Sequence, residues 1–280
     1  MSRISYLNGE FLPHEKCFVH IEDRGFQFAD GAYEVTLFKN GKLIDGEAHL
    51  ARFFRSLNEL KIEHNFTAEA LKEIQLELFL RNKMLDGACY LNVTRGATNR
   101  TPWCPKGIAP TINATVSLAK KVSTEEFEKG FTAMTHEDIR WSRCDIKTVA
   151  LLASTLMNQN AKDLGFNDVI FVRDGFITEA SFANAFIVDA HDTLITRAAD
   201  NFILRGITRD RLIELAKKNG IKVEERKFTK NELMTAKEVF LTSSSLILRP
   251  IVKVDEAVIA DGKAGKIAKL LTGFYNEFAG

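Results

Sequence analysis

Two kinds of hydrophobic spacing alternate along this chain, and together they restrict its fold to a mixture of strands and helices. Apolar residues at every second position predict strands, whereas apolar residues three to four apart predict amphipathic helices. In the first half, strands are expected at Ile4–Leu7, Glu10–Leu12, Tyr33–Lys39, Lys42–Ile44, Ala88–Arg95 and Thr111–Leu118. Asn8-Gly9 and Asn40-Gly41 are hairpin-turn dipeptides. Helices are expected over about His49–Lys61 and Ala68–Asn82.

The second half alternates strands with helices. Extended segments are expected at Phe131–Trp141, Asp168–Val172, Phe182–Val188, Thr193–Thr196, Val223–Lys227 and Val239–Leu241, and helices at Val149–Leu164, Thr208–Asn219 and Gly265–Phe278. The charged stretch 120–129 lacks core spacing. We therefore expect a smaller α+β domain at 1–119, an interdomain linker at 120–129 and a larger domain at 130–280.

Composition excludes several classes of function. Lys and Arg number 38 and Asp and Glu 37, so the formal net charge of +1 predicts no nucleic-acid or membrane partner. The amino end, MSRISYLNGE, lacks the apolar stretch of a secretory signal, which favours a cytoplasmic location. The four cysteines are scattered and the six histidines lack ligand spacing, so we expect reduced thiols and no metal site.

A glycine leads directly into a helix in RGITRDRLIELAKKNG, residues 205–220. Backbone N–H groups at a helix start, together with the hydroxyl of Thr208, are suited to an anion such as phosphate, and Gly206 allows a close approach. A plain helix N-cap is the alternative interpretation. Hydroxyl groups also follow an apolar strand at residues 242–245, where they either bind an oxyanion or solvate a loop.

Lys147 and Glu179 lie in mainly apolar surroundings where charged groups need a specific reason to be present. Lys147 precedes the helix expected from Val149, and a desolvated lysine has the lowered pKa that Schiff-base chemistry requires. Most lysines are solvated, however, so this position alone does not establish a catalytic group. Glu179 needs a partner, and a protonated pyridine nitrogen would serve.

A longer pattern makes the interpretation specific. It consists of Glu179, Ser181, Asn184, Ala185, Phe186, Leu194, Thr196, Leu204, Gly206, Ile207 and Arg209. In identity and spacing it resembles the signature of the class IV aminotransferases. Four further segments resemble the D-amino-acid aminotransferase branch of that family: Glu22–Val35, Val93–Arg100, Glu137–Lys147 and Ile203–Asp210. The resemblance covers nearly the whole chain and implies a two-domain, mixed α/β (α+β) enzyme of fold type IV that uses pyridoxal 5'-phosphate.

The resemblance also implies residue roles. Lys147 matches the catalytic lysine that forms a Schiff base with the cofactor, and Glu179 matches the carboxylate on the pyridine nitrogen. The residues that match the phosphate site are Arg52, Ile207, Thr208, Ser243 and Ser244, and those that match the substrate-carboxylate site are Tyr33 and Arg100. Helical spacing alone places Arg52 on the surface, away from the apolar stripe of its helix.

Two departures concern the substrate pocket. Pro102 stands where the D-specific enzymes have a histidine, and Phe182 and Ala183 replace part of their serine-rich run. The resemblance implies amino transfer from a D-amino acid, D-alanine first, to 2-oxoglutarate or pyruvate, by a homodimer. The alternatives are an aminotransferase for branched-chain L-amino acids or (R)-amines, an aminodeoxychorismate lyase, and a non-catalytic cofactor-binding sensor.

Overall fold

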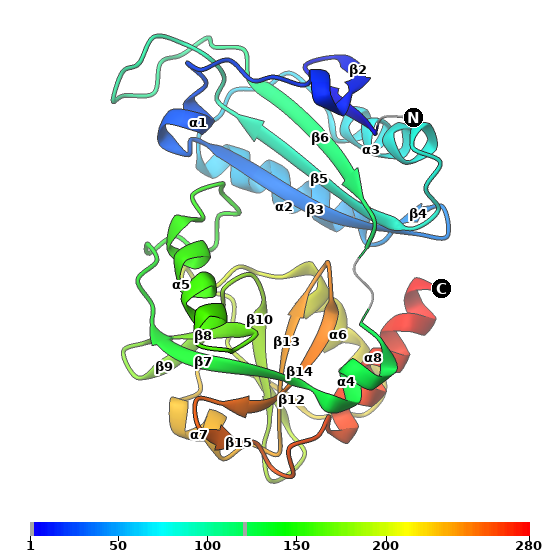
Figure 1. Ribbon diagram of the computed structural model, residues 1–280, viewed down its shortest axis with the longest axis vertical. Helices are drawn as coiled ribbons and strands as arrows, with labels where there is room; N and C mark the ends of the chain where they lie inside the picture. The colour runs from blue at the N-terminus through cyan, green and yellow to red at the C-terminus, as the bar shows by residue number, and fades with distance from the viewer. Residues whose placement is uncertain (1–2, 120–121) are drawn as a thin grey trace. The chain divides into compact units, whose positions relative to one another are not determined.

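The computed structural model describes residues 3–119 and 122–280. The chain divides into two compact units (Figure 1). Unit 1 comprises Met1–Ala119 together with Ile146–Leu151, and unit 2 comprises Lys120–Asp145 and Leu152–Gly280. Lys120 and Lys121, the first residues of the expected linker, lie outside the described residues.

Unit 1 is built on a six-stranded antiparallel sheet in the order β2-β1-β6-β5-β3-β4. Its elements are β1 (Ile4–Leu7), β2 (Glu10–Pro13), α1 (Arg24–Phe28), β3 (Gly31–Lys39), β4 (Lys42–Leu43), α2 (Gly46–Glu59), α3 (Ala68–Arg81), β5 (Gly87–Thr94) and β6 (Thr111–Ser117), with a 3-10 turn at His14–Lys16. Helix α2 packs on β3, and α3 packs on β1 and β6. Phe53 and Leu57 of α2 and Leu71 and Leu78 of α3 are fully buried and form part of the core of this unit.

The segment Ile146–Leu151 belongs to unit 1 because its backbone bonds to the start of β3. The N–H of Tyr33 donates to the Lys147 carbonyl at 3.0 Å, and the N–H of Val149 donates to the Gly31 carbonyl at 3.0 Å. These bonds hold the segment extended. Helix α5 therefore begins at Leu152, and the expectation of a helix from Val149 was wrong.

Unit 2 contains a nine-stranded mixed sheet in the order β12-β11-β10-β13-β14-β7-β8-β9, with β15 paired to β14. Its strands are β7 (Phe131–Glu137), β8 (Asp168–Arg173), β9 (Phe176–Ala180), β10 (Asn184–Val188), β11 (Leu194–Thr196), β12 (Val223–Glu225), β13 (Glu238–Ser243), β14 (Ile247–Val254) and β15 (Ala257–Val258). Its helices are α4 (Thr124–Lys129), α5 (Leu152–Asp163), α6 (Ile207–Lys218), α7 (Lys230–Met234) and α8 (Lys266–Ala279). Helices α6 and α8 pack against each other and on β13.

Five elements of unit 2 were not expected from the sequence: β9, β14, β15, α4 and α7. Strands β9 and β14 were missed, and β9 carries Glu179. Helix α4 lies within the stretch expected to be a linker, and a capping box between Ser123 and Glu126 fixes its start. The mixed α+β fold class is nevertheless the one expected. Over the described residues, the helices are too short or too polar to span a bilayer.

Candidate active site

Unit 1 brings the predicted residues Lys147 and Tyr33 together. The Lys147 Nζ atom lies 4.3 Å from the centroid of the Tyr33 ring. That ring stacks on Tyr90 at 5.3 Å, and burial together with the neighbouring Tyr33 raises the pKa of Tyr90 to about 12. The Lys147 side chain is half-buried. An amine held beside an aromatic ring is suited to covalent and proton-transfer chemistry.

Arg52 is buried, so the surface position expected from helical spacing was wrong. Only 8% of Arg52 is exposed, because β3 provides a carboxylate under α2. Its Nε donates to Glu34 Oε2 at 2.9 Å and its Nη2 donates to Glu34 Oε1 at 2.6 Å. His49 Nδ1 lies 3.0 Å from the same Oε1. Burial by itself would raise the pKa of Glu34, but the charge and hydrogen bonds of Arg52 and His49 outweigh it and hold this pKa far below its usual value.

One serine connects Arg52 with Lys147. The Ser56 hydroxyl donates to the Arg52 carbonyl at 3.1 Å and accepts the Lys147 backbone N–H at 3.2 Å. Arg52, Lys147 and Tyr33 therefore belong to one continuous set of contacts in unit 1.

Arg100 is separate from that set. It is exposed, and its guanidinium carbon lies 4.9 Å from the centroid of Phe28, a ring that Arg24 also contacts at 4.6 Å. Across the described ranges, no hydrogen bond or ion pair joins Arg100 to Tyr33. Pro102, which follows closely, is also exposed.

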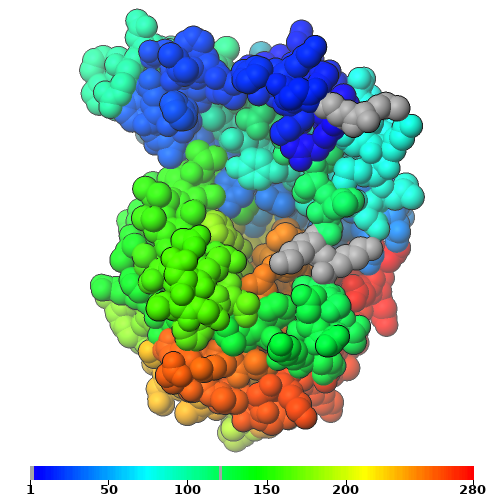
Figure 2. All heavy atoms as spheres, in the orientation of Figure 1, coloured from blue at the N-terminus to red at the C-terminus, as the bar shows by residue number. Residues whose placement is uncertain are grey.

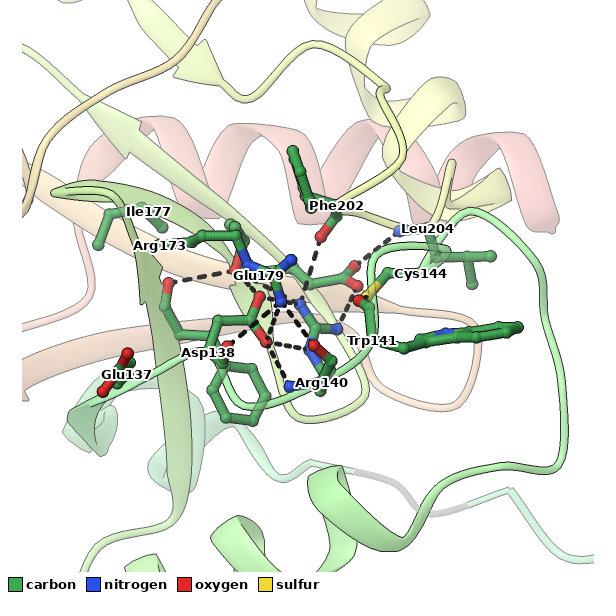
Figure 3. A network of polar contacts seen from close by, with 12 residues as sticks. Glu137, Asp138, Arg140, Trp141, Cys144, Arg173, Ile177, Glu179, Phe202 and Leu204 are labelled. Atoms are coloured by element: carbon green, nitrogen blue, oxygen red, sulfur yellow. Dashed lines mark hydrogen bonds and ion pairs between the residues drawn. The ribbon is translucent and has the colours of Figure 1, made fainter.

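Unit 2 places Glu179 at the centre of a buried polar network (Figure 3). Arg140 Nη1 donates to Glu179 Oε1 at 2.6 Å. Oε2 accepts from Asn184 Nδ2 at 3.0 Å and from the Leu204 N–H at 3.1 Å. Strand β9 positions the carboxylate, β10 provides the amide, and the loop before α6 provides the backbone donor.

Arg140 forms ion pairs with two carboxylates, those of Glu179 and Asp138. It also donates from Nε to Asp138 Oδ1 at 2.9 Å and from Nη2 to Asp138 Oδ2 at 2.9 Å. Burial raises the pKa of Glu179, Arg140 offsets this only in part, and the negative charge of Asp138 adds to the rise. Glu179 is therefore a buried carboxylate with too little positive charge around it.

Asp138 and Arg140 were not predicted as site residues. The available signal was an oppositely charged pair two residues apart in the segment that leads to Lys147. Spacing along the chain does not show that the pair faces Glu179, because that contact is made by the fold.

The start of α6 is the second polar feature near Glu179. Gly206 is its N-cap and no side chain caps the helix. A Cβ at Gly206 would overlap Asn184 Oδ1, so only glycine fits. Thr208, in the first turn, is buried. Because the first N–H groups of a helix lack intrahelical partners, this end is suited to an anion.

The hydroxyl run after β13 was expected near the same place. Thr242 is paired with Asn184 in the register of β13 and β10. Its Oγ1 atom is buried and has no hydrogen-bond partner in the part of the chain that the structure describes. Ser243 ends β13 and Ser244 lies in the following turn, both half-buried. The sequence placed Thr242 in this hydroxyl run, and the structure adds that its hydroxyl is buried.

The features of unit 2 suit a ligand with a phosphate and a basic ring, and the amine in unit 1 suits a carbonyl carbon. The α6 start and Thr242 provide donors that lack partners, as a phosphate requires. Glu179 lacks full compensation, as expected for a carboxylate that pairs with a protonated ring nitrogen. In unit 1, Lys147 provides the amine.

Comparisons with known proteins agree with this chemistry. The family described as Amino-transferase class IV matches residues 31–254. The chain is 36% identical to the D-alanine aminotransferase of Bacillus licheniformis, over 94% of this chain and 92% of that protein. It is 38% identical to the D-alanine aminotransferase of Listeria monocytogenes serotype 1/2a (strain 10403S), over 97% of this chain and 94% of that protein.

Solved structures show the same fold. The branched-chain amino acid aminotransferase of Escherichia coli aligns with a TM-score of 0.92 at 22% identity, over 99% of this chain and 95% of that one. A hypothetical aminotransferase from Mycobacterium tuberculosis in its PLP-bound form aligns with a TM-score of 0.84 at 22% identity, over 98% and 97%. The match over most of the chain, with relatives above 30% identity over nearly their full length, shows that this protein belongs to the class IV aminotransferases, a family of pyridoxal-phosphate-dependent transaminases.

Proposed function

We propose that the protein transfers the amino group of a D-amino acid, with D-alanine as the leading donor, to a 2-oxo acid such as 2-oxoglutarate or pyruvate. The observation that carries this proposal is the similarity to D-alanine aminotransferases over nearly the full length of both chains. The solved structures below 25% identity support the fold alone, so they do not favour a branched-chain substrate.

Pyridoxal 5'-phosphate is the proposed cofactor. In this proposal Ile207, Thr208, Ser243 and Ser244 hold its phosphate, as the sequence predicts, and Thr242 adds its unpartnered hydroxyl. Arg52 is the proposed cation of the phosphate site, and Glu34 fixes its guanidinium in one orientation. When bound, the cofactor supplies a carbonyl carbon for amine exchange and a ring that takes up the electrons left at the substrate Cα.

Lys147 is the proposed catalytic lysine. With the cofactor bound, the Lys147 Nζ would be the group that attaches to it and would act as the general base that accepts the proton from the substrate Cα. Its place beside Tyr33 supports this role, since the ring restricts the amine to a small region.

Glu179 is proposed to keep the ring nitrogen protonated. A buried carboxylate that is only partly compensated gains most from a partner that brings a positive charge. Arg140 bonds to Oε1 of the carboxylate (Figure 3), Asn184 bonds to Oε2, and together they fix its orientation.

Tyr33 and Arg100 are the proposed groups for the substrate carboxylate. An arginine holds a carboxylate through two parallel hydrogen bonds, whereas Pro102 has no donor to add. We therefore propose that this protein binds the substrate carboxylate more weakly than relatives that have a histidine at that position. The proposed substrate pocket is also altered by the two residues Phe182, which is half-exposed, and Ala183, which follow Glu179.

A homodimer and a cytoplasmic location complete the proposal. Unit 1 exposes large apolar side chains, among them Phe18 (80% exposed), Phe26 (80%) and Trp103 (66%). Apolar side chains exposed in this number are typical of protein contacts, and a second copy would cover them. The cysteines are free thiols, as is usual in the cytoplasm.

The test is a half-reaction of the yellow holoenzyme with single amino donors, followed through the cofactor absorbance. D-Alanine should convert the bound cofactor to its amine form faster than L-alanine or L-leucine. In Arg100→Ala, the loss should fall on donors with an α-carboxylate and spare simple (R)-amines. Faster conversion by L-leucine would move the protein to the branched-chain branch, and faster conversion by an (R)-amine than by any amino acid would make it an amine transaminase.

A further inference from the structure

A cavity of about 370 Å³ lies in unit 2, at the ends of several strands. Its wall is formed by α5, the start of β8, the turn after β9, and the hairpin between β13 and β14. In Figure 2 the orange atoms of that hairpin are recessed beside green segments of unit 2. The volume lies in the range of small-molecule sites, roughly 300–1,000 Å³.

The cavity adjoins the proposed phosphate site and shares Ser243 with it. Successive side chains of a strand point to opposite faces. Leu241 and Ser243 line the cavity, whereas Thr242 between them faces Asn184 and is absent from the lining. The hairpin therefore places Thr242 on the face of Asn184 and Ser243 in the wall of the cavity.

Arg249 contributes a mostly buried guanidinium to the wall of the cavity. Only 15% of its side chain is exposed, and its guanidinium carbon lies 4.9 Å from the centroid of Phe131. Within the described ranges, Arg249 Nε is buried without a hydrogen-bond partner. Burial lowers the pKa of Arg249, and Asp168 offsets this only in part. Guanidinium donors removed from water and left unpaired carry a large desolvation cost.

Asp168 forms an ion pair with this guanidinium but no hydrogen bond. Its Oδ2 lies 3.6 Å from Arg249 Nη1, which is beyond hydrogen-bond distance. Its Oδ1 already accepts from Ser181 Oγ at 2.5 Å, from the Val169 N–H at 2.8 Å and from Asn158 Nδ2 at 3.2 Å. The carboxylate is thus held in place by other donors, and the arginine is left facing the cavity.

The rest of the wall adds donors and a second positive charge. Ser243 and Ser245 place their hydroxyls 3.3 Å apart, and Lys162 lies at the exposed rim. Against two cations the lining residues include one carboxylate, that of Asp168. Such a wall is suited to an anion of organic-acid size.

We propose that this cavity binds the carboxylate of a small organic acid, with Arg249 as its anchor. A guanidinium with free donors matches a carboxylate in charge and in planar geometry, and it gains most when the pair is shielded from water. Two kinds of ligand carry such a carboxylate: a dicarboxylic substrate, through its second carboxylate, or an acid that takes no part in the reaction.

The test is calorimetric titration of the holoenzyme with glutarate and with succinate, which lack the amino and oxo groups needed for transamination. Wild type should bind glutarate saturably, and Arg249→Met should bind it at least about tenfold more weakly. Lys162→Met should weaken binding about two- to fivefold, because that charge is exposed. Arg226→Met is the matched control, since it removes a surface arginine paired with Glu224 and Glu232, and its affinity should be unchanged.

The absence of saturable glutarate binding, or equal binding by wild type and Arg249→Met, would overturn the proposal and leave a cavity filled by water. If Arg249→Met does not fold, Lys162→Met decides, and unchanged affinity in that variant would overturn it. Competition between glutarate and 2-oxoglutarate in steady-state kinetics would identify the substrate as the source, and non-competitive inhibition would identify a separate acid. Because binding is measured with non-reacting acids, this result is independent of which amino donor the enzyme prefers.

Discussion

Glu34 in unit 1 and Glu179 in unit 2 are both buried carboxylates bonded to an arginine, yet their pKa values move in opposite directions. Glu34 receives two hydrogen bonds from Arg52 and a contact from His49. Glu179 receives one bond from Arg140, whose other donors bond to Asp138, Thr178 and the Phe202 carbonyl. The positive charges and hydrogen-bond donors around a buried carboxylate, and not burial alone, decide whether the fold favours its charged form.

This difference distinguishes Glu34, a carboxylate that stabilises the fold, from Glu179, a carboxylate that is suited to a role in the reaction. A fully paired carboxylate is not stabilised further by a ligand. Breaking the pair leaves the arginine buried without a compensating negative charge. A carboxylate that is incompletely paired can be stabilised by a cationic group of a ligand. We therefore expect substitution of Glu34 to affect mainly folding and substitution of Glu179 to affect mainly turnover.

The largest effect is expected at Lys147, in the same unit as Glu34. Lys147→Ala should lower turnover at least about 10⁴-fold, since it removes both the covalent attachment and the general base. Borohydride reduction of wild type should place the pyridoxyl label on the peptide that contains Lys147. The exposed Lys72→Ala variant is the control and should keep full activity. A label on another lysine would remove the central assignment.

Glu34→Gln should lower the free energy of unfolding by about 3–5 kcal/mol, because Arg52 is left buried against a neutral amide. Denaturant unfolding of the apoprotein measures this. The control is Glu77→Gln, which breaks the exposed Glu77–Arg81 pair and should cost no more than about 0.5 kcal/mol. A difference below about 1 kcal/mol for Glu34→Gln would show that the buried pair contributes little.

The same variant has an expected pH dependence. The folded pKa of Glu34 lies below its usual value of 4.5, so its charged form stabilises the fold fully above pH 4.5 and loses this contribution as pH falls toward the folded pKa. The gap between wild type and Glu34→Gln should therefore shrink below pH 4.5. For Glu179, whose pKa is raised, the sign is opposite: its charge costs stability at high pH, and this cost is relieved as pH falls through the raised pKa. A gap for Glu34→Gln that stays constant down to acid denaturation would contradict the paired state of Glu34.

Glu179→Gln should slow turnover about 10²- to 10³-fold, or roughly 2.7–4 kcal/mol, a loss like that of one preorganised charge-stabilising group. Cofactor affinity should change little, because the phosphate contacts remain. Turnover and cofactor titration of the same preparation test both statements. Turnover within a factor of about two of wild type would contradict the proposed role.

The smallest effect is expected at the phosphate site. Thr208→Val should weaken cofactor binding by about 1.5–3 kcal/mol, or roughly 10- to 150-fold in Kd, because one donor to a dianion is lost. Titration of the apoprotein measures it, and Arg52→Ala should act in the same direction. Thr272→Val, which removes a hydroxyl bonded only within α8, serves as the control. Unchanged affinity in both site variants would place the phosphate elsewhere.

Much of the secondary structure could be predicted because its signals are local. Helices α2, α3, α6 and α8 lie within about three residues of their expected bounds, since amphipathic spacing needs only one face of one helix. Strands β9 and β14 were missed for a physical reason. Four of the five β9 residues are buried, including Thr178 and Glu179, so the strand shows no apolar alternation, and Pro250 interrupts β14.

The sequence by itself determined the family, the mixed α+β class and the predicted positions of Lys147, Glu179 and the glycine-to-helix turn at Gly206, because each rests on residue identity and spacing. Only the tertiary structure decided that Arg52 is buried against Glu34, that Lys147 lies on an extended segment beside Tyr33, and that Arg249 faces a cavity. Each of these facts depends on residues far apart in the chain. Charge compensation and burial are set by such non-local contacts, so spacing along one segment does not contain them.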